Sequence, residues 1–133
     1  MPIRCIVDLP RQRVNALVEG DVTVEDAIQA FDRVLRSPGL HPGFVILSDH
    51  RAVGRSFSIE DIHRVIEWME DHVIELRPTR WAAVVFRPST FGVMRMLGAR
   101  AKLVVGIEVG VFTNLDAGEE WLTLPHPEPD SSR

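Results

Sequence analysis

The chain has 133 residues, of which 45% are hydrophobic and 26% charged, and its formal net charge is −4. This length suits one domain, and the negative charge argues against a general nucleic-acid binder, which needs an excess of basic side chains. The longest apolar run, residues 81–86, is far shorter than the roughly 20 residues that cross a bilayer, so we expect no transmembrane segment.

The compartment is suggested by two features near the N-terminus. The first residues lack the long apolar stretch and the small-residue cleavage site of a signal peptide. Cys5 is the single cysteine of the chain, so an internal disulfide cannot form. Both features favour a protein of the reducing cytoplasm.

The first part of the chain predicts a β-hairpin followed by a helix. Residues 3–9 and 13–18 are apolar segments with a short polar connection, which favours antiparallel pairing. Thr23 stands three residues before Asp26 and just ahead of apolar residues at spacings of three and four. This pattern predicts a capping box and an amphipathic helix that ends at the Ser-Pro-Gly sequence of residues 37–39.

The middle of the chain repeats a strand and a helix. Residues 44–47 form a continuous apolar run typical of a strand covered on both faces. A long loop over residues 48–57 is expected next, followed by a helix that Ser58 caps and that runs to Leu76. Residues 81–86 predict the next buried strand.

The last part predicts a helix, a strand and a short helix. Ser89 is a candidate cap for a helix that runs to about Leu103. Residues 108–112 predict a strand, and Asn114 or Asp116 can open a final helix that ends at residues 121–122.

The predicted order is ββαβαβαβα, in one α/β domain over residues 1–122. Strands separated by helices pair in parallel through right-handed crossovers, so we expect a mixed, mostly parallel sheet. Residues 123–133 contain three prolines and are expected to be a disordered tail.

Three segments carry a resemblance to a known family. They are Gly20–Asp26; Leu47-Ser48-Asp49 followed by Phe57–Asp61; and Val111-Phe112 followed by Ala117 and Trp121-Leu122. With them the chain, over residues 3–122, resembles the SpoIIAA-like proteins of the STAS (anti-sigma-factor antagonist) fold, relatives of the CRAL-TRIO lipid-binding proteins. The resemblance implies a βα superhelix used for regulation or ligand binding rather than catalysis.

The chain departs from that family at its regulatory serine. STAS proteins commonly carry a phosphorylatable serine in an Asp-Ser-Ser/Thr-Gly stretch at a helix start. The corresponding residues 49–58 contain no such stretch, and neither Ser56 nor Ser58 follows an aspartate. This difference argues against a phosphorylation switch.

The expected loop at residues 48–57 is the first candidate site. It follows the carboxyl end of a central strand, where open α/β sheets bind ligands, and it leads into the free amides of a helix start. Arg51 and Arg55 beside those amides could hold a phosphate or carboxylate; alternatively, Ser58 only caps the helix and the arginines are solvated. The candidate anion-binding residues are Asp49, His50, Arg51, Arg55, Ser56, Ser58, Arg87 and Arg95.

The helix over residues 89–103 is the second candidate site. Residues 87–107 hold four basic and no acidic residues, so this segment carries +4 and the remainder −8. An apolar stripe flanked by basic side chains could contact an anionic membrane or shelter an acyl chain; the alternative is a core helix with solvated charges. The candidate apolar pocket consists of Phe57, Trp68, Phe91 and Met94.

Two further patterns concern self-association and catalysis. Val65, Trp68 and His72 form a flank that suits either a homodimer interface or a wider core. His63 and His72 are nine residues apart on a helix, about 180° around it, and cannot share a metal ion. We find no signature of a nucleotide-binding or hydrolase site, and we expect no cofactor, metal or catalytic residue.

These observations leave three hypotheses in order of preference. The first is a non-enzymatic STAS-like regulatory or protein-interaction domain, expected to form a homodimer or bind a protein partner. The second is a small carrier of a lipid or another apolar anion. The third is an enzyme that uses His50 as a base.

Overall fold

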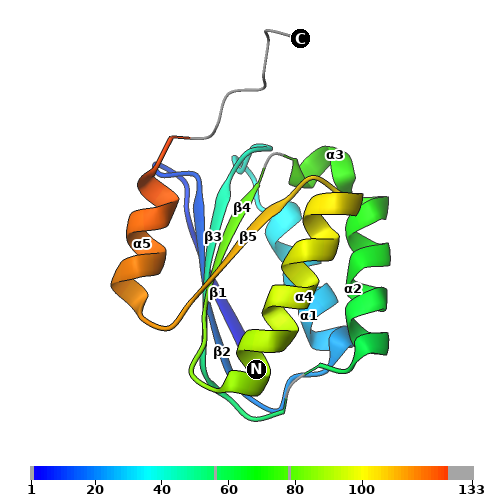
Figure 1. Ribbon diagram of the computed structural model, residues 1–133. Coiled ribbons are helices and arrows are strands. Elements are labelled where there is room, and N and C mark those ends of the chain that lie inside the picture. Colours follow the sequence, from blue (N-terminus) through cyan, green and yellow to red (C-terminus); the bar gives the residue numbers. More distant parts are fainter. Residues whose placement is uncertain (1, 56, 78, 126–133) are drawn as a thin grey trace, which may run out of the picture.

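The computed structural model describes residues 2–55, 57–77 and 79–125 (Figure 1). The described residues contain a five-stranded sheet whose strands follow one another in chain order. The first strand is antiparallel to the second, and all later neighbours are parallel. The strands are β1 (Ile3–Asp8), β2 (Arg13–Gly20), β3 (Val45–Val53), β4 (Arg80–Val84) and β5 (Glu108–Phe112).

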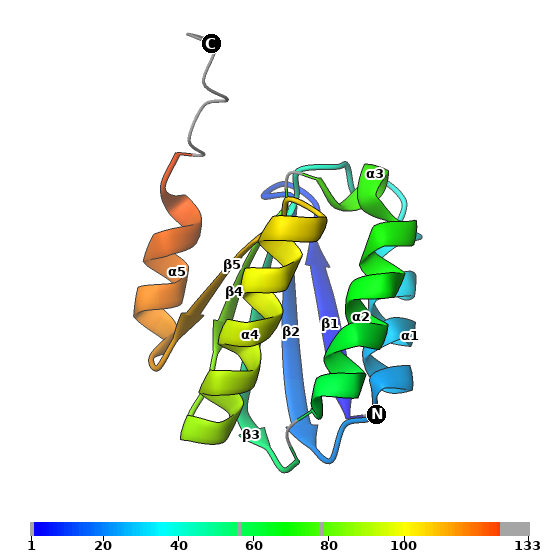
Figure 2. The ribbon, with the colours of Figure 1, turned by 45° about the vertical axis from the view of Figure 1, so that its right-hand side comes forward.

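The helices cover the two faces of the sheet unequally. Right-handed crossovers between strands in sequential order all pass over the same face, and three helices therefore lie together there. Figures 1 and 2 show α1, α2 and α4 on this face and α5 alone on the other. The helices are α1 (Val24–Leu35), α2 (Ile59–Asp71), α3 (Val73–Leu76), α4 (Pro88–Val104) and α5 (Leu115–Thr123).

The predicted order ββαβαβαβα and the mostly parallel sheet are confirmed. Both predicted capping boxes are also present. The Thr23 hydroxyl accepts from the amide of Asp26 at 3.1 Å, and the Asp26 carboxylate accepts from the Thr23 amide at 3.0 Å. Ser58 and Asp61 make the same two bonds at the start of α2. These caps satisfy amides that have no partner within the helix.

The prediction of a loop over residues 48–57 is wrong for most of this range, because β3 continues to Val53. The parallel neighbour β2 extends to Gly20 and pairs with β3 as far as Val53. One additional residue of β3 is accommodated between the pairs Leu17–Asp49 and Glu19–Ala52. Only a short connection is left between β3 and α2.

The prediction of a single helix from Ser58 to Leu76 is also wrong, because the structure has two helices that are separated at His72. The His72 imidazole donates through Nδ1 to the carbonyl of Trp68, at 2.8 Å. In a continuous helix this carbonyl would accept the His72 amide, which bonds the carbonyl of Met69 instead. The side chain thus competes with the backbone and ends α2.

Ser89 is not the cap of α4. The helix begins one residue earlier, at Pro88, and Arg87 is at the capping position. Proline suits the first helical position because its fixed φ is helical and its missing amide hydrogen would have no partner there. Asn114, in contrast, caps α5 through its side-chain oxygen, as predicted.

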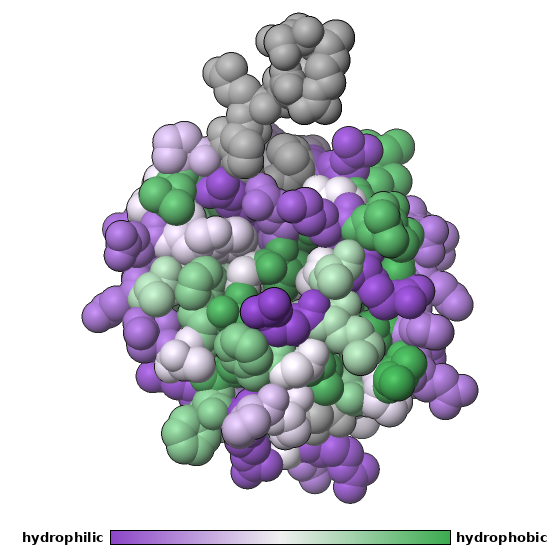
Figure 3. Space-filling view, in the orientation of Figure 1, coloured by the Kyte–Doolittle hydropathy of each residue, from purple (hydrophilic) through white to green (hydrophobic). Residues whose placement is uncertain are grey.

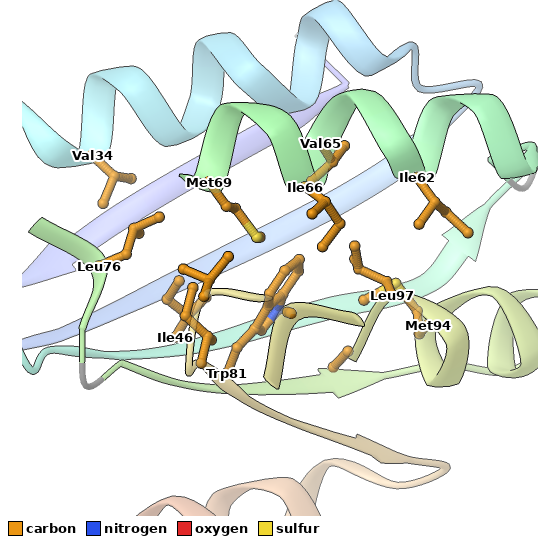
Figure 4. Close-up of a cluster of buried hydrophobic side chains, with 14 of the residues drawn as sticks. Val34, Ile46, Ile62, Val65, Ile66, Met69, Leu76, Trp81, Met94 and Leu97 are labelled. Carbon is orange, nitrogen blue, oxygen red and sulfur yellow. The ribbon is translucent and has the colours of Figure 1, made fainter. Parts of the chain in front are cut away.

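The main core lies between the sheet and the three helices. Figure 4 shows Trp81 projecting from β4 into this layer, among Ile46 of β3 and the buried residues of α2. A smaller cluster joins α5 to the opposite face through Leu47, Val84 and Leu122. Of the predicted tail at residues 123–133, residues 126–133 lie outside the described part of the chain.

Candidate functional site

The candidate residues 49–51 belong to β3 and not to a loop. Because successive residues of a strand face opposite sides, these residues of the predicted anion site are divided between the two faces of the sheet. His50 lies on the face that α1, α2 and α4 cover, since it contacts Ser48, which contacts Trp81. Asp49 and Arg51 lie on the other face. There the Arg51 guanidinium donates to both carboxylate oxygens of Asp49, at 2.9 and 2.8 Å, and lowers the pKa of that carboxyl. The charge of Arg51 is therefore already compensated.

His50 ends a chain of hydrogen bonds within the helical face. The indole Nε1 of Trp81 can only donate, and it bonds the Ser48 hydroxyl oxygen at 2.6 Å. The Ser48 hydroxyl oxygen is also 2.7 Å from Nε2 of His50, and in the tautomer protonated on Nδ1 the hydroxyl donates to this nitrogen. Burial lowers the pKa of His50 to about 4, in agreement with a neutral ring at pH 7.

A cavity of about 70 Å³ opens beside His50 between the sheet and the three helices. Its walls are almost entirely apolar and come from β1, β2, β3, β4 and the three covering helices. Phe57 and Met94 of the predicted apolar pocket line this cavity, whereas Trp68 and Phe91 do not. The polar side chains along it are His50, Arg55 and Thr90.

Trp68 is used elsewhere in the helical layer. Its ring stacks on Phe31 of α1 at 5.4 Å and on His72 at 4.0 Å, and Val65 beside it is buried. This packing agrees with the intramolecular alternative for the flank of Val65, Trp68 and His72.

The three candidate arginines on the helical face have different surroundings. Arg87 donates to the carbonyl of Gly54 at 2.7 Å, which joins the start of α4 to the β3–α2 connection. The guanidinium of Arg95 lies over the ring of Phe91, 5.8 Å from its centroid, and does not line the cavity. Arg55 is exposed, lines the cavity and has no partner among the described residues. Arg55 is thus the available cation at this opening.

The two candidate serines have separate outcomes. The Ser58 hydroxyl accepts from the Asp61 amide as the cap of α2. This was the alternative to its role in anion binding. Ser56 lies outside the described residues.

Sequence reasoning missed Ser48 and the contribution of the first strands to the cavity, which Ile3 and Val18 line. The sequence signal that could have indicated the role of Ser48 is its position in an apolar strand, two residues before a histidine. Its partner Trp81 is 33 residues away, and only the pairing of β3 with β4 brings the two together.

Two classes of site are not found in the part of the chain that the structure describes. None of its helices has the length and apolar character needed to cross a membrane. Among the same residues, no three His, Cys, Asp or Glu side chains gather as a metal ion would require.

Comparison with known proteins supports the fold. No protein-family model and no curated protein matches the sequence. A crystal structure of an uncharacterized protein of the DUF3478 family from Shewanella loihica PV-4, described as having a SpoIIAA-like fold, superposes with a TM-score of 0.61. The two chains are 17% identical, and the match covers 90% of this chain and 93% of the other. The present chain therefore has a SpoIIAA-like fold, as its resemblance implied.

Proposed function

We propose that this domain is a non-catalytic binding module for a small apolar carboxylate. The cavity beside Arg55 is the observation that carries the proposal, because it combines apolar walls with one uncompensated cation. Apolar walls favour an aliphatic group, and a guanidinium at the opening favours a carboxylate head group. Such a site suits either a carrier or a regulatory domain that responds to its ligand.

The neutral His50 adds a hydrogen-bond donor to this site. In the tautomer in which Nε2 accepts from Ser48, the proton of the neutral imidazole is on Nδ1. No described residue accepts from Nδ1, so this N–H is available on a ring that lines the cavity. It can donate to a carboxylate without itself carrying a charge.

The same contacts argue for binding rather than catalysis. Ser48 lies within hydrogen-bond distance of His50, as a serine nucleophile would of its base, but Ser48 is only 3% exposed and does not line the cavity. A histidine with a pKa of about 4 is also a weak base at neutral pH.

The test is a titration with butyrate, followed by amide chemical shifts, in two matched variants. Arg55→Gln removes the proposed head-group contact, and we expect butyrate to bind about 10- to 100-fold more weakly. Arg51→Gln removes an arginine that Asp49 already compensates on the opposite face, and should leave the affinity unchanged.

Three outcomes would contradict the proposal: no butyrate shifts in the wild type, equal affinity in wild type and Arg55→Gln, or equal weakening in both variants. The uncharged analogue 1-butanol serves as a second control. Its affinity should not depend on Arg55.

A second candidate function, self-association, is favoured by hydrophobic side chains at the same end of the sheet. Ile59, at the start of α2, and Phe86, just after β4, are 61% and 76% exposed. Phe86 precedes Arg87, which bonds Gly54 in the β3–α2 connection, and Ile59 follows that connection along the chain. Large exposed hydrophobic side chains are typical of interaction surfaces.

Sedimentation velocity tests this second candidate. If this end forms a homodimer, Phe86→Ser should shift the protein toward monomer. Ile74→Ser, an 80% exposed residue of α3 at the other end of the parallel strands, is the matched control and should have no effect. A wild-type protein that stays monomeric at all concentrations excludes the homodimer.

A further inference from the structure

A second cavity, of about 60 Å³, lies beneath α1. Like the first, it is lined by apolar groups and is partly open to the surface, and Cys5 of β1 contributes its thiol to the wall. Val14 and Ile46 form its floor on β2 and β3, and Ala30 and Val34 of α1 cover it. Burial raises the pKa of Cys5, as expected for a thiol within apolar surroundings.

The two cavities share a wall. Ile3, Ala27 and Phe31 line both of them. Phe31 is the largest of the three, and its ring packs on Trp68 and, edge-on, on Trp81, with both centroids 5.4 Å away. Phe31 therefore stands between the cavities, and a ligand that reaches from one to the other has to displace its side chain.

The volumes limit what each cavity can hold. An engineered apolar cavity of about 150 Å³ binds benzene, which has six carbons, so each cavity alone accommodates roughly three carbons. A ligand that uses both reaches roughly twice that length. A passage opened by displacing one side chain is narrow, so it favours an unbranched chain over a branched or ring-shaped one.

We propose that the ligands of this site are unbranched aliphatic carboxylates of medium length, such as octanoate. This proposal rests on the proposed function. The carboxylate of such a ligand binds at Arg55, and its chain passes Phe31 to end in the second cavity, near Cys5. Short carboxylates such as butyrate occupy the first cavity only. The second cavity thus selects the ligand by its length.

Methyl-resolved NMR of the full chain separates the two cavities, because each has methyl groups of its own. Val53, Val65 and Leu97 line the first cavity only, and Val14 and Ile46 line the second only. Butyrate should shift the first set. Octanoate should shift both and bind more tightly by roughly fourfold per added carbon.

Filling the second cavity provides an independent measurement. Ala30→Leu places a larger side chain in it and should reduce the affinity for octanoate toward that for butyrate in the wild type. The wild-type methyl map decides the question by itself if this variant does not fold.

The results separate the two proposals. If neither carboxylate shifts the first set of methyl groups, the proposed function itself fails. If both bind but octanoate leaves the second set unchanged, only the length selection is wrong. The length selection is also wrong if octanoate shifts Val7 and Val34 but neither Val14 nor Ile46, because Val7 and Val34 line an open groove at β1 and α1.

Discussion

His50 is the side chain with the widest consequences, because its neighbour Ser48 connects it to Trp81, which is distant in the sequence. Its imidazole is neutral because it is buried, and it completes the hydrogen bonds of Ser48 and Trp81. Protonation would charge the ring and replace its acceptor nitrogen with a donor. The network is therefore sensitive to acid.

We expect the free energy of unfolding to fall as the pH is lowered from about 6.5 to about 4. The folded-state pKa of His50 is about 4, below the ordinary histidine pKa of about 6.5, so the unfolded chain binds more protons between these values. The loss attributable to His50 is roughly 3 kcal/mol. Urea titrations at several pH values measure it.

His50→Asn should flatten this part of the pH profile. The control is His63→Asn, the same substitution at a histidine that is exposed on α2. A His50→Asn protein with the wild-type slope would show that His50 does not titrate as described.

Ser48 can be tested in the same way. Ser48→Ala leaves the buried N–H of Trp81 without an acceptor, and should lower the free energy of unfolding by about 1–3 kcal/mol. Ser37→Ala, which removes a hydroxyl bond to the carbonyl of Arg33 near the end of α1, should cost less than about 0.5 kcal/mol. Equal losses in urea titrations would argue against a special role of the Trp81–Ser48 bond.

At the scale of elements, the helix caps show which features local sequence can predict. A capping box is completed within four residues, so the starts of α1 and α2 follow from the sequence. The extension of β3 depends on the partner strand β2, and the end of α2 depends on a side-chain bond of His72. Neither has a signal within a short window of the sequence.

The cap of α2 gives a direct prediction. Ser58→Ala removes the acceptor for the Asp61 amide and should destabilise the protein by about 1 kcal/mol. Ser58→Asp restores an acceptor and should retain the wild-type stability. Thermal unfolding of the two variants measures this, and the same loss in both would contradict a capping role.

The attachment of α5 depends on a buried arginine of β4. Arg80 is 4% exposed and donates to the carbonyls of Leu124 at 2.6 Å and Pro125 at 3.1 Å, just after α5. We expect Arg80→Met to loosen α5, so that its amides exchange hydrogen at least about 10-fold faster while those of α4 do not. Uniformly faster exchange would instead indicate a loss of global stability.

At the scale of the whole molecule, the unequal distribution of helices creates the site. Three helices on one face leave room between them and the sheet for the two cavities, whereas α5 packs closely on the other face through Leu47, Val84 and Leu122. Figure 3 shows the side where β5 and α4 lie in front, on which hydrophobic and hydrophilic side chains are intermixed. The cavities lie inside the helical layer.

The sequence predicted the candidate site only in part. Arg55, His50, Phe57 and Met94 were named as candidates and line the cavity together. The compensation of Arg51 by Asp49 depends on how far β3 extends, which the sequence does not reveal locally. The cavities themselves result from packing between α1, α2, α4 and the sheet, and no residue pattern encodes an unfilled volume.

A crystal structure of the protein with octanoate tests the central claim most directly. We predict the carboxylate beside Arg55 and His50, the Phe31 ring displaced from its present position, and the chain end among Val14, Val34 and Ile46. A chain bound on the outer surface, or cavities that stay empty at saturating octanoate, would contradict the account.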